Sequence, residues 1–116
     1  MAYQTVDVIN LMEEKTEIKV SALRVDGGAS MNNLLLDFQA DVLGIPVERP
    51  ECIETTALGA AYLCGLSAGV YASLEEIKKN RKTALVIEPS KDSDWRKKKL
   101  SEWQKAVKRS LLWKEE

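Results

Sequence analysis

The groups best suited to binding a ligand lie in one stretch, residues 25–33, of sequence Val-Asp-Gly-Gly-Ala-Ser-Met-Asn-Asn. An apolar run ends there in an acid and two glycines, and a helical pattern follows. This order leaves free backbone N–H groups at a helix N-terminus. Gly27 and Gly28 have no Cβ and can take positive φ, so a ligand can approach the backbone closely. Asn32 adds an amide donor and acceptor in the first turn. The stretch predicts a ligand-binding corner.

Other chemistry is limited by what the chain lacks. It has no histidine, which excludes a Ser-His-Asp triad and histidine acid–base catalysis within these residues. Cys52 and Cys64 stand in no metal-ligand spacing and are interpreted as incidental thiols. Asp26 is the one acid of the glycine turn, and we expect it to make local hydrogen bonds. No catalytic residue and no metal ligand is predicted in this chain.

Composition indicates a single globular domain. The 116 residues are 45% hydrophobic and 30% charged, with a net charge of −1, which argues against a nucleic-acid-binding protein. No apolar run approaches the roughly 18 residues of a membrane span, and the N-terminus has no signal-peptide pattern. We therefore expect a cytoplasmic protein with no nucleic-acid or membrane partner.

The elements that must position the corner follow from periodicity. Residues 2–14 form a helical pattern and residues 20–25 a short apolar strand. A second helix, with Ser30 as its expected N-cap, runs to Gly44, and residues 45–49 form the next strand. Strand, helix and strand in this order predict parallel neighbours joined by a right-handed crossover, which is a unit of an α/β sheet.

The second half of the chain begins with an unusual helix, which Thr55 or Thr56 is expected to cap. Its small residues recur at a spacing of three to four, and we expect them to pack closely on the sheet. A Ser-Leu-Glu-Glu capping box, an edge strand at 83–87 and a basic amphipathic helix from Trp95 to Trp113 follow. The stripe of small residues comprises Ala57, Ala60, Ala61, Cys64 and Ala68.

The chain also begins in mid-pattern, because the first helix is already running at residue 2 with no capping residue before it. We expect a piece of a longer protein. The predicted division is 1–90 for the main α/β domain and 91–116 for a C-terminal helix packed on the same domain.

Spacing alone leaves two interpretations of the corner open besides a purely structural turn. A dinucleotide fold would use Glu48, about 20 residues after the glycines, as its ribose ligand. The Gly-x-Gly-x-x-Gly fingerprint, however, would need glycines where Ala29 and Asn32 stand. The other interpretation is a nucleotide site in which Gly27 and Gly28 lie flat under the nucleotide.

Three blocks in order carry a resemblance. They are Leu-Arg-Val-Asp-Gly-Gly-Ala-Ser from residue 23, Gln-Ala-Asp-Val-Leu-Gly-Ile-Pro-Val from residue 39, and Glu-Thr-Thr-Ala-Leu-Gly-Ala-Ala-Tyr-Leu-Cys-Gly-Leu from residue 54. Together they resemble the C-terminal part of the FGGY carbohydrate kinases, over nearly the whole chain, and most of all the members that act on glycerol.

The resemblance implies a fold and an activity. The fold is a partial ribonuclease-H-like (actin-type ATPase) domain, α/β, with a short, mostly parallel sheet flanked by helices and a C-terminal amphipathic helix. The activity is phosphoryl transfer from ATP, with Mg²⁺, to glycerol to give glycerol 3-phosphate. The adenosine motif would comprise Gly27, Gly28, Ala29 and Asn32.

The catalytic, metal-binding and substrate-binding residues of such kinases have no counterpart in this chain. Its implied partner is the missing N-terminal kinase region, and we expect the chain alone to be inactive. The alternative is a non-catalytic module that binds adenine nucleotide or assists assembly. Apolar surface left open by the missing region predicts homo-oligomers, through the helix at 2–14 or the helix from Trp95 to Trp113.

Overall fold

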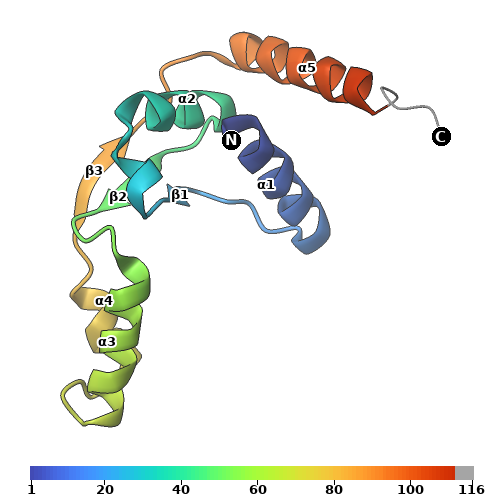
Figure 1. The fold of residues 1–116 in the computed structure, drawn as a ribbon. Coiled ribbons are helices and arrows are strands. Elements are labelled where there is room, and N and C mark those ends of the chain that lie inside the picture. Colours follow the sequence, from blue (N-terminus) through green and yellow to red (C-terminus); the bar gives the residue numbers. More distant parts are fainter. Residues whose placement is uncertain (112–116) are drawn as a thin grey trace.

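The computed structural model describes residues 1–111 and shows an α/β chain that bends around a small sheet (Figure 1). Helix α2, between the first two strands, makes the crossover predicted from the sequence. The elements in order are α1 (Ala2–Thr16), β1 (Leu23–Arg24), the 3-10 turn η1 (Gly28–Met31), α2 (Asn33–Leu43), β2 (Val47–Pro50), α3 (Thr55–Ser67), α4 (Leu74–Lys79), β3 (Thr83–Ile87) and α5 (Ser93–Ser110).

The sheet has the strand order β1-β2-β3. Strands β1 and β2 are parallel, with Leu23 opposite Val47, whereas β2 and β3 are antiparallel, with Val47 opposite Ile87. The α/β fold is confirmed, but the described sheet is mixed and not mostly parallel. Because β3 returns from the α3–α4 excursion in the opposite direction, it closes one edge of the sheet, and β1 forms the other.

Helix α2 lies between two small hydrophobic clusters and holds the described fold together. One side packs Leu36 and Ala40 against Val47 of the sheet. The other side packs Val42 against Ala2 and Val6 of α1. All six side chains are buried, so α2 fixes α1 and the sheet relative to each other, and with them the glycine turn at its N-terminal end.

Helix α5 docks by its aromatic side chains. Trp103 stacks on Tyr3 with ring centroids 5.3 Å apart, and Trp95 meets Phe38 edge-on at 6.0 Å. The Trp103 indole N–H donates to the Asp7 carboxylate at 2.8 Å. The helix begins at Ser93, two residues earlier than predicted, because the Asp92 side chain accepts the Trp95 backbone N–H and caps it. The predicted end at Trp113 lies outside the described residues.

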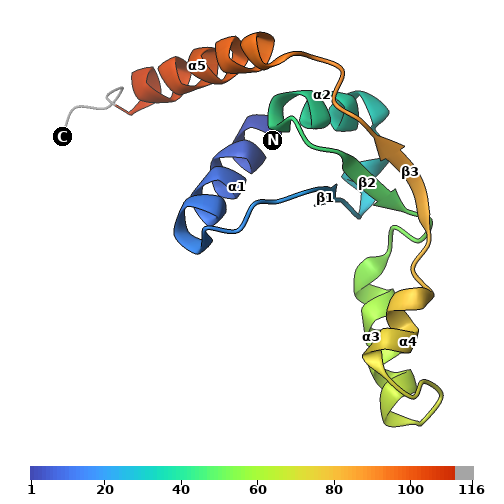
Figure 2. The ribbon, with the colours of Figure 1, turned by 180° about the vertical axis from the view of Figure 1, so that it is seen from behind.

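Helices α3 and α4 form an arm that stands away from the sheet (Figure 2). The expectation that the small residues of α3 pack on the sheet is therefore wrong: α3 buries none of its residues, and all five members of the small-residue stripe are exposed. Alanine side chains bury little apolar area, so the stripe provides little free energy to fold the arm back. Within the arm, Tyr62 meets Tyr71 edge-on at 5.6 Å.

Two cap predictions were also wrong, and one was right. Ser30 does not cap α2; its hydroxyl donates to the Gly27 carbonyl at 2.7 Å, and Asn32 is the cap. At the start of α3 the N-cap position is Glu54, which makes no side-chain cap hydrogen bond. The predicted capping box is confirmed for its serine, whose hydroxyl accepts the Glu76 N–H at 3.2 Å, whereas the Glu76 carboxylate accepts the N–H of Ala72 and not that of Ser73. No helix of residues 1–111 is long and apolar enough to cross a membrane.

Candidate functional site

The glycine turn follows β1 directly, at the carboxyl end of the parallel strand pair, where open α/β sheets bind their ligands. Gly27 has φ +71°, which a residue with a Cβ adopts only under strain. Its N–H donates to the Ile53 carbonyl at 2.9 Å, and its carbonyl accepts from the Ser30 N–H at 3.1 Å. A Cβ added at Gly27 or Gly28 would meet no other group within 4 Å. Backbone hydrogen bonds therefore hold the turn in place, and the side on which a Cβ would project is open.

Asp26, directly before the glycines, has a structural partner. Its carboxylate accepts a hydrogen bond from the Thr55 hydroxyl, which joins the end of β1 to the first residue of α3. This bond and the one from Gly27 to Ile53 tie the glycine turn to the loop after β2. Asp26 was expected to make local hydrogen bonds, whereas the bond found reaches a residue 29 positions away.

Asn32 has a role in the fold that the sequence did not reveal. Its Oδ1 accepts the Leu35 N–H at 3.1 Å and so caps α2. The residue is exposed, and no hydrogen bond from its Nδ2 is found among residues 1–111. The side chain therefore uses its acceptor for the helix and keeps its amide donor available to a ligand.

Arg49, on β2, is a supporting residue that sequence reasoning missed. Its guanidinium Nη1 donates to the Ser30 carbonyl at 2.9 Å and to Asn33 Oδ1 at 3.0 Å. These hydrogen bonds link β2 to the junction between η1 and α2. Its place at the carboxyl end of a strand was the available signal, but its partners are set by the crossover, which brings residues 16 to 19 positions away within reach.

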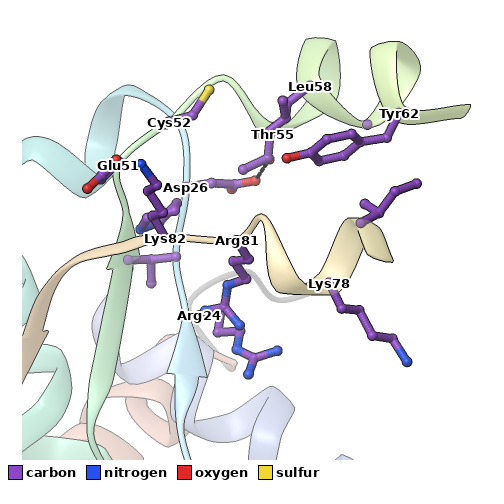
Figure 3. A pocket seen from close by; sticks show the side chains of 14 residues that line it. Arg24, Asp26, Glu51, Cys52, Thr55, Leu58, Tyr62, Lys78, Arg81 and Lys82 are labelled. Atoms are coloured by element: carbon purple, nitrogen blue, oxygen red, sulfur yellow. Dashed lines mark hydrogen bonds between the residues drawn. The ribbon is translucent and has the colours of Figure 1, made fainter. Parts of the chain in front are cut away.

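Two hollows flank the turn. The larger, about 590 Å³, lies between the strand ends and the α3–α4 arm (Figure 3). There Tyr62 directs its hydroxyl toward the Thr55–Asp26 pair. The smaller, about 260 Å³, lies between α1, α2 and the turn, and Ala29 lines it. Asp26 lines both hollows. Gly27, Gly28, Ala29 and Asn32 lie on one turn, and of these four only Ala29 lines one of the two hollows.

The charges near the larger hollow are organised by Glu48. Its carboxylate accepts from Arg81 Nη2 at 2.7 Å and from Arg24 Nε at 3.2 Å. Hydrogen bonds from Arg81 and then from Arg24 lower the pKa of Glu48 below its ordinary value. Glu48 therefore serves as the shared anion of two ion pairs, which link β2 to Arg24 of β1 and to Arg81 in the segment before β3.

Residues 1–68 match the C-terminal domain of the FGGY family of carbohydrate kinases. The chain belongs to this family. Among its relatives, glycerol kinase of Thermoanaerobacter sp. (strain X514) is 53% identical over 116 residues, which are 100% of this chain and 23% of that protein. Glycerol kinase 2 of Thermotoga maritima is 54% identical over 113 residues, or 97% of this chain and 23% of the relative. The FGGY chain thus spans about a quarter of the length of the curated relatives it matches.

Solved structures agree with the fold. The crystal structure of Plasmodium falciparum glycerol kinase with ADP superposes with a TM-score of 0.84 and 34% identity, over 96% of this chain and 22% of that chain. Xylulose kinase from Lactobacillus acidophilus superposes with a TM-score of 0.69 at 19% identity, which bears on the fold alone. The expected actin-like kinase fold is confirmed, and membership of the FGGY family replaces the dinucleotide alternative built on Glu48.

Proposed function

We propose that this chain is the C-terminal part of an ATP-dependent glycerol kinase, which transfers the γ-phosphoryl group of ATP to glycerol to give glycerol 3-phosphate. One observation carries the proposal: proteins named glycerol kinase are more than 50% identical to this chain over its whole length. We further propose a cytoplasmic location, as the sequence predicts.

Within that kinase, the glycine turn would form the adenosine side of the nucleotide site. The open fronts of Gly27 and Gly28 allow a flat ring to approach the backbone, since no neighbouring group stands there. Asn32 Nδ2 would donate to a ring nitrogen or oxygen of the nucleotide, and Ala29 would contribute a small apolar contact. The crystal structure of Plasmodium falciparum glycerol kinase with ADP superposes on this chain with a TM-score of 0.84.

The groups that perform phosphoryl transfer belong, in this proposal, to the remaining three quarters of the kinase. Transfer depends on positioning the γ-phosphate and on stabilising its charge with cations and Mg²⁺. We assign none of these roles to the present chain, and we expect the 116 residues by themselves to show no glycerol phosphorylation. Residues 1–90 would belong to the nucleotide-binding domain, and residues 91–116 to a helix packed on it.

Titration of the ¹⁵N-labelled chain with ADP, followed by amide chemical shifts, tests the nucleotide site. We expect shifts centred on Gly27, Gly28 and Asn32. Shifts confined to residues remote from the turn would refute the site. Activity is tested by adding the complementary region of a relative: a complex that binds ADP but does not phosphorylate glycerol would favour the alternative, a non-catalytic nucleotide-binding or assembly module.

A further inference from the structure

Arg49 holds the chain on both sides of Asn32, the side chain proposed to bind the nucleotide. Its Nη1 donates to the Ser30 carbonyl at 2.9 Å and to Asn33 Oδ1 at 3.0 Å. Ser30 is 2% exposed and belongs to η1, whereas Asn33 is the first residue of α2. One guanidinium nitrogen on β2 therefore fixes the two ends of the segment 30–33, and Asn32 lies between them.

The bonds of Ser30 extend this link to the glycines. The Ser30 hydroxyl and the Ser30 N–H both donate to the Gly27 carbonyl, at 2.7 and 3.1 Å. The Asn32 N–H donates to the Ala29 carbonyl at 3.2 Å, at the end of η1. Because Ser30 is bonded both to Gly27 and to Arg49, loss of the Arg49 side chain would loosen the placement of Asn32 relative to β2.

The charge of Arg49 stands in an unfavourable place for a residue that only stabilises the fold. A cation at a helix N-terminus faces the positive end of the helix dipole, and the Arg49 guanidinium bonds to the first residue of α2. Among residues 1–111 no carboxylate forms an ion pair with Arg49, whereas Arg24 and Arg81 both pair with Glu48. Departures from a local rule of this kind concentrate at functional sites. The bonds of Arg49 to the turn therefore indicate a role in the site.

We propose that Arg49 is a positioning residue of the nucleotide site: it holds Asn32 so that Nδ2 can donate to the nucleotide ring, and does not itself contact the nucleotide. The proposal rests on the proposed function in taking Nδ2 as that donor. Arg49 lines neither hollow beside the turn. A binding group must be kept within about 0.5 Å of its working position by supporting contacts. Asn32 is exposed, so packing provides little of that support and the bonds from Arg49 provide it.

Substitutions at the two ends of α2 test this role in the 116-residue chain. Arg49→Met removes the bonds to residues 30 and 33. Arg96→Met is the matched control, because the Arg96 Nε donates to the Asp41 carbonyl at 3.0 Å, at the other end of the same helix. Without ligand, we expect Arg49→Met to lower the ¹⁵N order parameter of the Asn32 backbone amide from about 0.85 to below about 0.6. Arg96→Met should destabilise the fold and leave that order parameter unchanged.

Titration with adenosine measures the consequence for binding, and the lack of phosphate removes any attraction to the Arg49 charge. We expect Arg49→Met to raise Kd by up to about fivefold, the loss expected for Asn32→Ala, and Arg96→Met to leave Kd unchanged. In the Asn32→Ala background, Arg49→Met should have no further effect on Kd, because it acts through Asn32. Asn33→Ala removes only one of the two bonds, so it should change both measurements in the same direction by less; it replaces Arg49→Met if that variant does not fold.

Three results would each overturn the proposal. They are an unchanged order parameter at Asn32 in Arg49→Met, a change of equal size in Arg96→Met, and losses of affinity that add in the Arg49→Met, Asn32→Ala double variant. Additive losses would show that Arg49 contacts the nucleotide directly. An unsubstituted chain that binds no adenosine would count against the proposed function instead, and the order parameters measured without ligand would still decide the role of Arg49.

Discussion

Asn32 joins the fold and the proposed nucleotide site in one side chain, so its two roles can be separated by substitution. Oδ1 caps α2 by accepting the Leu35 N–H at 3.1 Å, and Nδ2 is proposed to donate to the nucleotide. Asn32→Ala removes both groups. Asn32→Asp keeps an oxygen acceptor for the cap, where aspartate ranks with asparagine, but removes the amide donor.

The loss of the helix cap and the loss of the bond to the nucleotide have different expected sizes. Loss of an N-cap side chain costs about 1 kcal/mol, which corresponds to a fall in Tm of about 4 °C for a chain of this length. Loss of one hydrogen bond to the nucleotide costs about 1 kcal/mol net, or about fivefold in Kd. Asn32→Ala should therefore lose both stability and affinity, whereas Asn32→Asp should keep its stability, since a negative charge at a helix N-terminus is favourable.

Thermal unfolding and calorimetric titration measure the two effects. Adenosine should be titrated alongside ADP, because it carries no phosphate and so removes the repulsion between the introduced carboxylate and the phosphates. Unchanged adenosine affinity in both variants would refute the assignment of Asn32 Nδ2 to the adenosine site. An unchanged Tm for Asn32→Ala would refute the reasoning about the cap.

Three further predictions concern the framework that holds the site. Gly44→Ala should destabilise the fold by about 1–2 kcal/mol, because φ is +74° and the new Cβ would overlap the Arg96 guanidinium; urea unfolding measures the loss. Asp41→Ala should cost about 2–3 kcal/mol, because this buried carboxylate accepts from the Ser90 N–H at 2.7 Å and the Lys91 N–H at 3.1 Å; Asp41→Asn should lose less in the same assay. Since the folded pKa of Glu48 is lowered from 4.5, its stabilisation is present above that pH and is lost as the pH falls through the folded pKa. Glu48→Gln should remove this part of the acid dependence, and an unaltered stability profile between about pH 2 and 6 would contradict it.

Local patterns were sufficient for most of the elements. The crossover helix, its end at Gly44 and the Ser73 capping box were predicted because each depends on residues within about four positions of one another. The edge strand at 83–87 was predicted with its observed bounds, Thr83–Ile87. Gly27 was singled out as a residue that could take positive φ, and it does.

Features that depend on contacts far apart in sequence were missed. The hydrogen bonds from Arg49 to Ser30 and Asn33, and the ion pairs of Glu48 with Arg24 and Arg81, span 16 to 33 positions. Ser30 and Asn32 are both favourable N-cap residues for α2. The Ser30 hydroxyl donates to the Gly27 carbonyl instead, and Asn32 caps the helix.

The sequence by itself determined the family, the α/β order of elements and the place of the glycine corner, because these depend on local residue types and on their spacing. Only the tertiary structure showed that Asn32 divides its amide between a helix cap and an open donor, and that Asp26 is held by Thr55. It also decided the position of α3, which stands away from the sheet and buries none of its residues. A periodicity marks a face that can be buried, but the packing partner decides whether it is.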